Sequence, residues 1–162
     1  HKAIRRQRQM CIRDRFWEKR SAKDTVLTYY ESILDNLSCC HNFDVYGHLD
    51  YIARYIPANS YTYDWHDFND LICIILKTII EQGKGIEINT AGLKYGMPEP
   101  NPCLDIVKIY HDLGGEIITV GSDAHEVKFF AYRFDVVADM LKNAGFNYYT
   151  IFNERKPEFI RL

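Results

Sequence analysis

The fold of this chain is constrained most by a repeated alternation of helical segments and short strands. Apolar residues at three- and four-residue spacing predict helices, and short apolar or alternating runs predict strands. Strands that alternate with helices favour parallel strands joined by crossover helices, and therefore an α/β layered or barrel architecture. The expected helices span 21–37, 68–82 and 104–113, with a helix or helix pair at 127–143, and the expected strands span 43–48, 85–89, 117–120 and 148–152.

An Asp-x-His motif follows the third expected strand, in the segment Gly121-Ser122-Asp123-Ala124-His125. Side chains two residues apart in an extended segment project to the same side, so Asp123 and His125 can address one point beyond the strand. Carboxylate oxygen and imidazole nitrogen together suit zinc, manganese or iron. The alternative is that Asp123 caps the following helix beside an unrelated histidine.

Polar residues also mark the ends of the other expected strands. His48 ends the first strand, and Glu87 and Asn89 lie in the second. In parallel α/β folds the carboxyl ends of the strands gather on one face, so these side chains are expected to converge with Asp123 and His125. Taken singly, His48 fits a half-buried histidine bonded to backbone, and Glu87 fits a solvent-facing strand residue. Together they favour a functional constellation.

The composition describes one globular domain. The chain has 162 residues, of which 47% are hydrophobic, and its formal net charge is −2. Such a charge gives no argument for nucleic-acid or membrane partners. The longest apolar run, at 71–76, is far shorter than a membrane span, and no secretory signal is visible. We therefore expect a cytoplasmic protein.

The first residues differ from the rest of the chain. Residues 1–15 are basic and lack apolar periodicity, and we interpret them as a non-native or disordered segment, with a nucleic-acid-binding arm as the alternative. Residues 16–162 form the expected domain. The adjacent Cys39 and Cys40 are expected to be reduced structural thiols, although such a pair can also bind metal or oxidise.

Three segments resemble the PHP superfamily, named for polymerase and histidinol phosphatase, and within it the histidinol-phosphate phosphatases. They are residues 43–55, 83–93 and 121–125. Two short segments near the C-terminus, 148–150 and 155–157, are also similar. The resemblance covers residues 16–162. It implies the C-terminal part of a distorted (β/α)₇ TIM-like barrel, with up to three divalent ions, Zn, Mn or Fe, at the carboxyl ends of the strands.

The resemblance assigns metal ligands residue by residue. His48 matches a histidine that helps to hold a second metal ion. Asp123 matches the carboxylate on the first ion, and His125 matches a ligand of the third. The family also has an early His-x-His motif and a glutamate that bridges two metals. This chain has no His-x-His motif, and Glu87 lies in a different segment from the bridging glutamate, so we expect the chain to be a fragment with incomplete metal sites.

The same resemblance assigns phosphate-binding residues. Arg54 matches an arginine that binds the substrate phosphate, and Lys94 lies where a second basic residue is expected, with a solvated loop lysine as the alternative. Ser122, Glu87 and Asn89 are expected to support the site without binding metal.

The implied activity is metal-dependent hydrolysis of histidinol phosphate, a small phosphate ester, in histidine biosynthesis. A metal-activated water would be the nucleophile, and the chain alone is expected to be inactive. The sequence leaves the oligomeric state open. It also leaves open two alternatives, namely another PHP phosphoesterase that acts on nucleic acid and a non-catalytic interaction module built on half a barrel.

Overall fold

A three-stranded parallel sheet lies at the centre of the structure, a computed structural model that describes residues 17, 20–57 and 59–162. The strands β1 (Val45–Gly47), β2 (Gly85–Asn89) and β3 (Ile118–Gly121) lie side by side in sequence order. Helices connect consecutive strands, as the alternation predicted. The expectation for residues 1–15 lies outside the described part of the chain.

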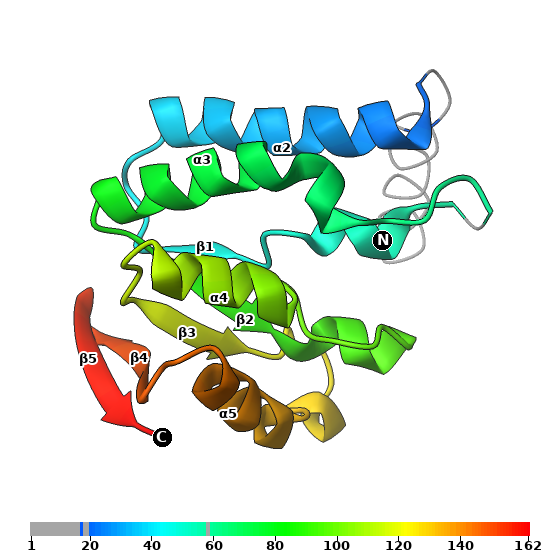
Figure 1. Ribbon diagram of the computed structural model, residues 1–162. Helices are drawn as coiled ribbons and strands as arrows, with labels where there is room; N and C mark the ends of the chain where they lie inside the picture. The colour runs from blue at the N-terminus through cyan, green and yellow to red at the C-terminus, as the bar shows by residue number, and fades with distance from the viewer. Residues whose placement is uncertain (1–16, 18–19, 58) are drawn as a thin grey trace, which may run out of the picture.

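The two long helices form close to the positions expected for them, which confirms that prediction. α2 (Ala22–Cys39) begins at Ser21, whose hydroxyl accepts a hydrogen bond from the backbone N–H of Asp24 at 3.1 Å. α3 (Asn69–Glu81) ends just before Gly83, which adopts a φ of +67° that glycine tolerates well. The apolar faces of both helices are buried, and α2 and α3 lie together above the sheet (Figure 1).

α4 (Leu104–Asp112) connects β2 to β3 and packs in front of the sheet (Figure 1). Tyr110 on this helix is fully buried, and its hydroxyl donates a hydrogen bond to the backbone oxygen of Ile117 at 3.0 Å. A Cβ atom on Gly115 would lie 2.3 Å from the Tyr110 ring. The glycine therefore leaves the space that the buried tyrosine occupies.

The two faces of the sheet differ in polarity. Ile86 and Ile88 of β2 are fully buried in the apolar core, which continues into the helices. Because side chains alternate along a strand, Glu87 and Asn89 lie on the opposite face. Their neighbours in register on this face are residues with small side chains, namely Gly47, Thr119 and Gly121. The second face is therefore polar.

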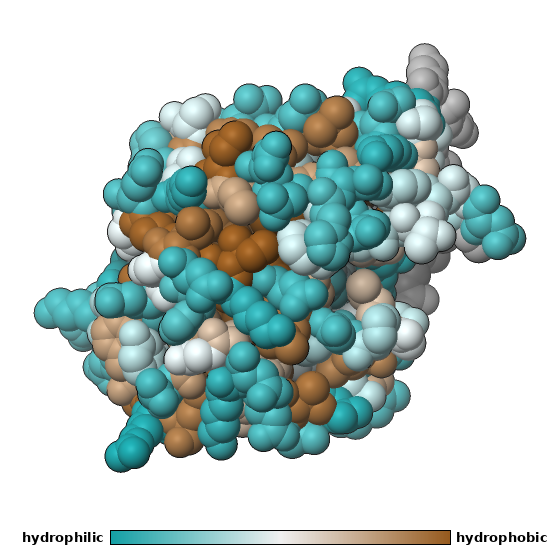
Figure 2. Space-filling model, in the orientation of Figure 1, coloured by the Kyte–Doolittle hydropathy of each residue, from teal (hydrophilic) through white to brown (hydrophobic). Residues whose placement is uncertain are grey.

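The outer layer of helices also carries hydrophobic side chains. Figure 2 shows them over the part of the surface where α3 and α4 lie side by side, among polar residues. Ile74 of α3 is half exposed. In the described part of the chain, no helix is both long and apolar enough to cross a membrane.

The fourth expected strand forms, but it does not join the parallel sheet. β4 (Tyr148–Asn153) pairs antiparallel with β5 (Lys156–Arg161), a strand that the sequence analysis missed. The turn between them consists of Glu154 and Arg155, with φ values of +49° and +63°. Such turns usually contain glycine or asparagine. The two turn positions have neither residue here, so the sequence did not predict the hairpin.

A side chain joins the two sheets. Thr150 of β4 is 1% exposed, and its hydroxyl oxygen accepts a hydrogen bond from the backbone N–H of Ile118 at 3.2 Å. Arg155 adds an exposed link, because its guanidinium donates to both carboxylate oxygens of Asp44, at 2.9 and 3.0 Å. β4 thus lies beside β3 without a backbone ladder between the two strands.

The segment at 127–143 resolves into two elements. A short 3₁₀ helix (Val127–Phe129) is followed by α5 (Phe134–Asn143), which lies below the sheet (Figure 1). Ala131 and Arg133 between them have positive φ values of 52° and 55°, which a continuous helix cannot contain. Further 3₁₀ helices fill expected loops or their edges, at Tyr51–Tyr55, Trp65–Phe68 and Thr90–Tyr95.

The Thr150 hydrogen bond gives a test of how the two sheets are joined. Thr150→Val keeps the shape of the side chain but leaves the buried N–H of Ile118 without an acceptor, so we expect the free energy of unfolding to fall by about 1–3 kcal/mol. Urea denaturation followed by circular dichroism measures this change. The control is Thr28→Val on the exposed side of α2, and equal effects of the two substitutions would contradict a structural role for Thr150.

Candidate functional site

Two strand ends carry residues with unusual backbone conformations. His48 directly follows β1 and has a φ of +39°, and Asp123 lies two residues after β3 and has a φ of +43°. Residues other than glycine rarely adopt positive φ values, and such positions often occur at functional sites. Both residues lie at the carboxyl edge of the parallel sheet, as predicted from the position of polar residues at the strand ends.

His48 has an incompletely satisfied side chain. Its ring packs on Tyr51, with ring centroids 4.5 Å apart, and its Nδ1 atom is buried with no hydrogen-bond partner among the described residues. The alternative, a half-buried histidine bonded to backbone, is therefore wrong for the Nδ1 atom. A buried imidazole nitrogen without a partner is available as a ligand.

Asp123 and His125 lie close together on the surface. The His125 Nδ1 and Asp123 Oδ1 atoms are 3.6 Å apart, and the two side chains are 83% and 50% exposed, respectively. Asp123 caps no helix, because the residues at the N-caps of the next two helical segments are Glu126 and Arg133. The capping alternative is therefore wrong, and the pair faces solvent at the strand edge.

Glu87 and Asn89 are linked to each other on the polar face. The Asn89 Nδ2 atom donates to Glu87 Oε2 at 3.1 Å, and its Oδ1 atom accepts from the backbone N–H of Ala91 at 2.8 Å. A Cβ atom on Gly121 would lie 2.1 Å from Glu87 Oε1, and one on Gly47 would lie 3.2 Å from Oε2. These two glycines therefore make room for the carboxylate, a role that sequence reasoning did not identify.

Lys94 contacts the turn that presents Asp123. Its Nζ atom donates to the backbone oxygen of Ser122 at 2.6 Å and to that of Asp123 at 3.3 Å. The ammonium also lies 4.9 Å from the centroid of the Phe129 ring. The alternative of a solvated loop lysine is therefore wrong, and Lys94 brings a positive charge to the Asp123 turn.

Arg54 lies among tyrosines. Its guanidinium carbon is 3.4 Å from the centroid of the Tyr95 ring, and Tyr51 and Tyr55 flank it at 5.3 and 5.4 Å. Its Nη1 atom donates to the Tyr51 hydroxyl. None of the ion pairs between described residues involves Arg54. A half-buried guanidinium without a carboxylate partner suits an anionic ligand.

Asp50 organises the loops around Arg54, and sequence reasoning missed it. The residue is 2% exposed, and its carboxylate accepts hydrogen bonds from Asn101 Nδ2 at 2.7 Å and from the backbone N–H of Cys103 at 3.0 Å. Burial raises the pKa of this carboxyl to about 6. The backbone of Asn101 pairs with that of Asn89 in both directions. Asp50 thus ties the segment after β1 to the loop after β2.

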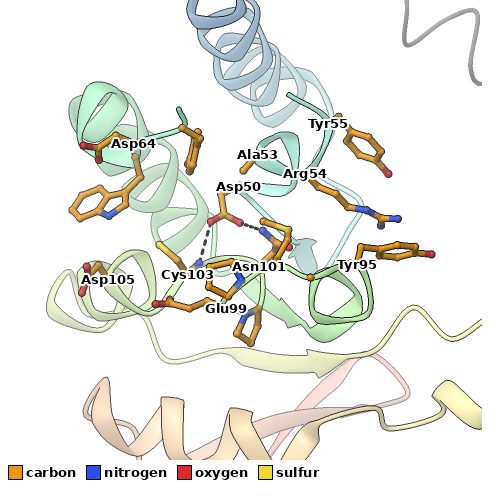
Figure 3. A pocket seen from close by; sticks show the side chains of 16 residues that line it. Asp50, Ala53, Arg54, Tyr55, Asp64, Tyr95, Glu99, Asn101, Cys103 and Asp105 are labelled. Carbon is orange, nitrogen blue, oxygen red and sulfur yellow. Dashed lines mark hydrogen bonds between the residues drawn. The ribbon is translucent and has the colours of Figure 1, made fainter. Parts of the chain in front are cut away.

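A hollow of about 770 Å³ extends beside Arg54, a volume typical of small-molecule sites. Figure 3 shows Arg54 between Tyr55 and Tyr95 at one end, and Asp64 and Asp105 toward the other. We call it the Tyr95–Trp65 hollow. It is lined by Asp50, Ala53, Arg54, Tyr55, Tyr63, Asp64, Trp65, Tyr95, Gly96, Met97, Pro98, Glu99, Pro100, Asn101, Cys103 and Asp105.

The site fits a metal centre only in part. His48, Asp123 and His125 offer the imidazole and carboxylate groups that divalent transition metals prefer. Within residues 17, 20–57 and 59–162, however, no group of three or more histidine, cysteine, aspartate or glutamate side chains could hold a metal ion. A zinc site takes about four ligands, so further ligands would have to come from outside these residues.

Comparison with known proteins places the chain in a family. A model of the PHP domain matches residues 5–91, which is more than half of the chain. The chain belongs to the PHP domain family. The match begins inside residues 1–15, whose interpretation as a non-native segment stays a prediction.

Curated relatives of this PHP chain carry the name histidinol-phosphatase. A probable histidinol-phosphatase from Thermotoga maritima is 43% identical over 67% of this chain and 44% of its own length. One from Clostridium acetobutylicum is 31% identical over 76% of this chain and 48% of its own length. The chain spans about half the length of the curated relatives it matches.

A solved structure extends the similarity to the fold. Histidinol phosphate phosphatase from Lactococcus lactis, complexed with zinc, L-histidinol and phosphate, superimposes with a TM-score of 0.76 at 25% identity. The superposition covers 88% of this chain and 54% of that one. The similarity to histidinol-phosphate phosphatases that was noted in the sequence is thereby confirmed.

The buried carboxylate of Asp50 gives a test of the loop arrangement. Asp50→Ala leaves the Asn101 amide and the Cys103 N–H without acceptors, so we expect the free energy of unfolding to fall by about 1–3 kcal/mol. Asp50→Asn retains one acceptor oxygen and should lose less. Urea denaturation measures both variants, and hydrogen exchange at Cys103 reports the local effect. An Asp50→Ala variant as stable as the parent, with a protected Cys103 amide, would contradict this role.

Proposed function

We propose that this chain is the C-terminal part of a PHP-family phosphatase that hydrolyses histidinol phosphate. The observation that carries the proposal is the guanidinium of Arg54, which is half-buried without a carboxylate partner among the described residues. It follows β1 closely, at the sheet edge where His48 and Asp123 also lie. The names of the relatives and the ligands of the Lactococcus lactis structure support the choice of substrate.

The topology supports a place in a larger barrel. The three parallel strands lie in sequence order, and right-handed crossovers in that order put α3 and α4 on the same face of the sheet. A sheet with helices on one face and polar side chains on the other is the arrangement of a (β/α) barrel segment. We propose that it is part of a distorted (β/α)₇ TIM-like barrel.

The residues of this chain have distinct roles in the proposed reaction. His48, Asp123 and His125 would hold divalent ions, and such ions supply a hydroxide by lowering the pKa of a bound water. Arg54 would bind the phosphate oxygens through two parallel N–H groups. Lys94 would hold the Asp123 turn in place. Hydrolysis breaks the phosphorus–oxygen ester bond and transfers a proton to the leaving alcohol.

A protein nucleophile is not required for this chemistry. Phosphoryl transfer depends mainly on positioning and electrostatic stabilisation. Cys39 and Cys40 are exposed free thiols at the end of α2, with Sγ atoms 3.7 Å apart, and neither lines the Tyr95–Trp65 hollow. Ser122 is 9% exposed, and its backbone oxygen accepts from Lys94.

Phosphate release from histidinol phosphate tests the proposal. The assay uses added manganese or zinc, on this chain alone and on a fusion that places the preceding half of the Thermotoga maritima relative before it. We expect turnover in the fusion and negligible turnover in the chain alone, because the described residues leave each metal site incomplete. Asp123→Ala should abolish the activity of the fusion.

Two results would count against the proposal. A folded fusion without activity toward histidinol phosphate would reject the function. Activity that is instead directed at nucleic acid would support another PHP phosphoesterase, whereas a stable, inactive chain with a defined partner would support an interaction module.

Arg54 provides a second test in the same fusion. Arg54→Ala should weaken inhibition by inorganic phosphate at least about 10-fold, equivalent to about 1.4 kcal/mol, while the bound metal stays the same. Arg54→Lys should restore little, because lysine lacks the planar fork of donors. Arg20→Ala, just before α2, is the control. Loss of metal from Arg54→Ala, measured by elemental analysis, would show that the assigned role is wrong.

A further inference from the structure

Two adjacent cysteines lie at the end of α2 with their sulfur atoms close together. Cys39 is the last residue of the helix and Cys40 is its C-cap, and both thiols are free and exposed. The two Sγ atoms are 3.7 Å apart, so the side chains turn toward each other. Exposed thiols at a helix end contribute little to packing, and their arrangement instead presents two sulfur atoms to solvent.

The separation of the two sulfur atoms decides between two kinds of thiol chemistry. A disulfide usually needs Cα atoms at least about 4.4 Å apart, whereas the Cα atoms of adjacent residues lie about 3.8 Å apart. A zinc ion holds each thiolate at about 2.3 Å, and two such thiolates in a tetrahedral arrangement are therefore about 3.8 Å apart. The observed 3.7 Å between Cys39 Sγ and Cys40 Sγ fits a bridging ion better than a direct bond.

We propose that Cys39 and Cys40 form a chelating site for a soft divalent metal ion of the zinc and cadmium type. Thiolates select such ions, and binding releases the two thiol protons to solvent as two sulfur–metal bonds form. No group of three possible ligands exists in the described part of the chain, so water fills the remaining coordination positions. The site is open, and its ion can exchange with other thiols. This inference does not depend on the phosphatase function.

The end of α2 is a favourable place for a positive ion. The carboxyl end of a helix carries partial negative charge, and the last turn of α2 contains no basic residue. The hydrogen bond with Cys40 raises the pKa of the Cys39 thiol, and the negative charge of Asp35 adds to this effect. A cation bound to the two sulfur atoms replaces the shared proton and is attracted by the same negative charges.

The cysteine pair lies away from the carboxyl edge of the sheet. Cys40 comes before β1, and His48 follows the same strand, so the two residues are at opposite ends of β1 (Figure 1). The connection between Cys40 and β1 is held by Arg155, which donates to the side chains of Asn42 and Asp44. An ion at the cysteine pair therefore leaves the His48 side chain free for its own ligand.

The other described cysteines are less suited to bind an ion. Cys73 Sγ contacts Asn69 Oδ1 on α3 at 3.8 Å. Cys103 is half-buried, and burial raises the pKa of its thiol to about 12. The thiolate, not the thiol, is the metal ligand. Cys73 therefore provides a matched control for a single thiol outside the pair.

Titration of the reduced full chain with cadmium tests the proposal. Charge transfer from thiolate to cadmium absorbs in the ultraviolet and reports sulfur ligands, which separates this site from carboxylate and imidazole ligands. We expect one ion per chain by this signal, bound at least about 10-fold more tightly than by reduced glutathione, which offers a single thiol. Cys39→Ser and Cys40→Ser should each weaken binding at least about 10-fold, because the chelate is lost, and the double substitution should abolish the signal.

The control Cys73→Ser should leave the cadmium affinity unchanged. Both members of the pair are exposed, so serine is expected to preserve the fold, and circular dichroism of each variant checks this. An affinity no greater than that of glutathione would overturn the inference. An absorbance that persists in the double variant would do the same, because it would place the sulfur ligands elsewhere in the chain.

Discussion

The buried carboxylate of Asp50 is the interaction on which the geometry of the candidate site depends. It accepts hydrogen bonds from Asn101 and from the backbone of Cys103, and Asn101 in turn pairs with Asn89 at the end of β2. A carboxylate in the interior is costly unless its oxygens are bonded, and burial is the reason that its pKa is raised. This buried carboxylate lies where the segment carrying Arg54 is held against the loop that lines the hollow.

The two faces of the sheet have different roles because side chains alternate along each strand. In β2, the isoleucines face the helices and complete the core, while Glu87 and Asn89 face the other side. Glycines in both neighbouring strands leave space for the Glu87 carboxylate. The polar groups are thus supported by a rigid sheet, and the residues with positive φ follow directly at its carboxyl edge. A site built in this way keeps its polar groups in place without disturbing the core.

Charge is distributed unevenly around this edge. Arg54 and Lys94 provide positive charge near the strand ends, and the far end of the hollow is acidic. Because the chain spans about half the length of its relatives, the proposed activity requires ligands from beyond the described residues.

The sequence by itself determined two long helices, expected at 21–37 and 68–82 and found at Ala22–Cys39 and Asn69–Glu81, and three parallel strands that have His48 and the Asp123 turn at one edge. These features follow from local periodicity and from the rule that parallel strands end on one face. Only the tertiary structure decided the β5 hairpin, because its turn lacks the usual residues. It alone also decided the roles of Asp50 and Lys94, whose partners lie 51 and 28 residues away along the chain. Burial and hydrogen bonding over such separations depend on packing, which no local pattern contains.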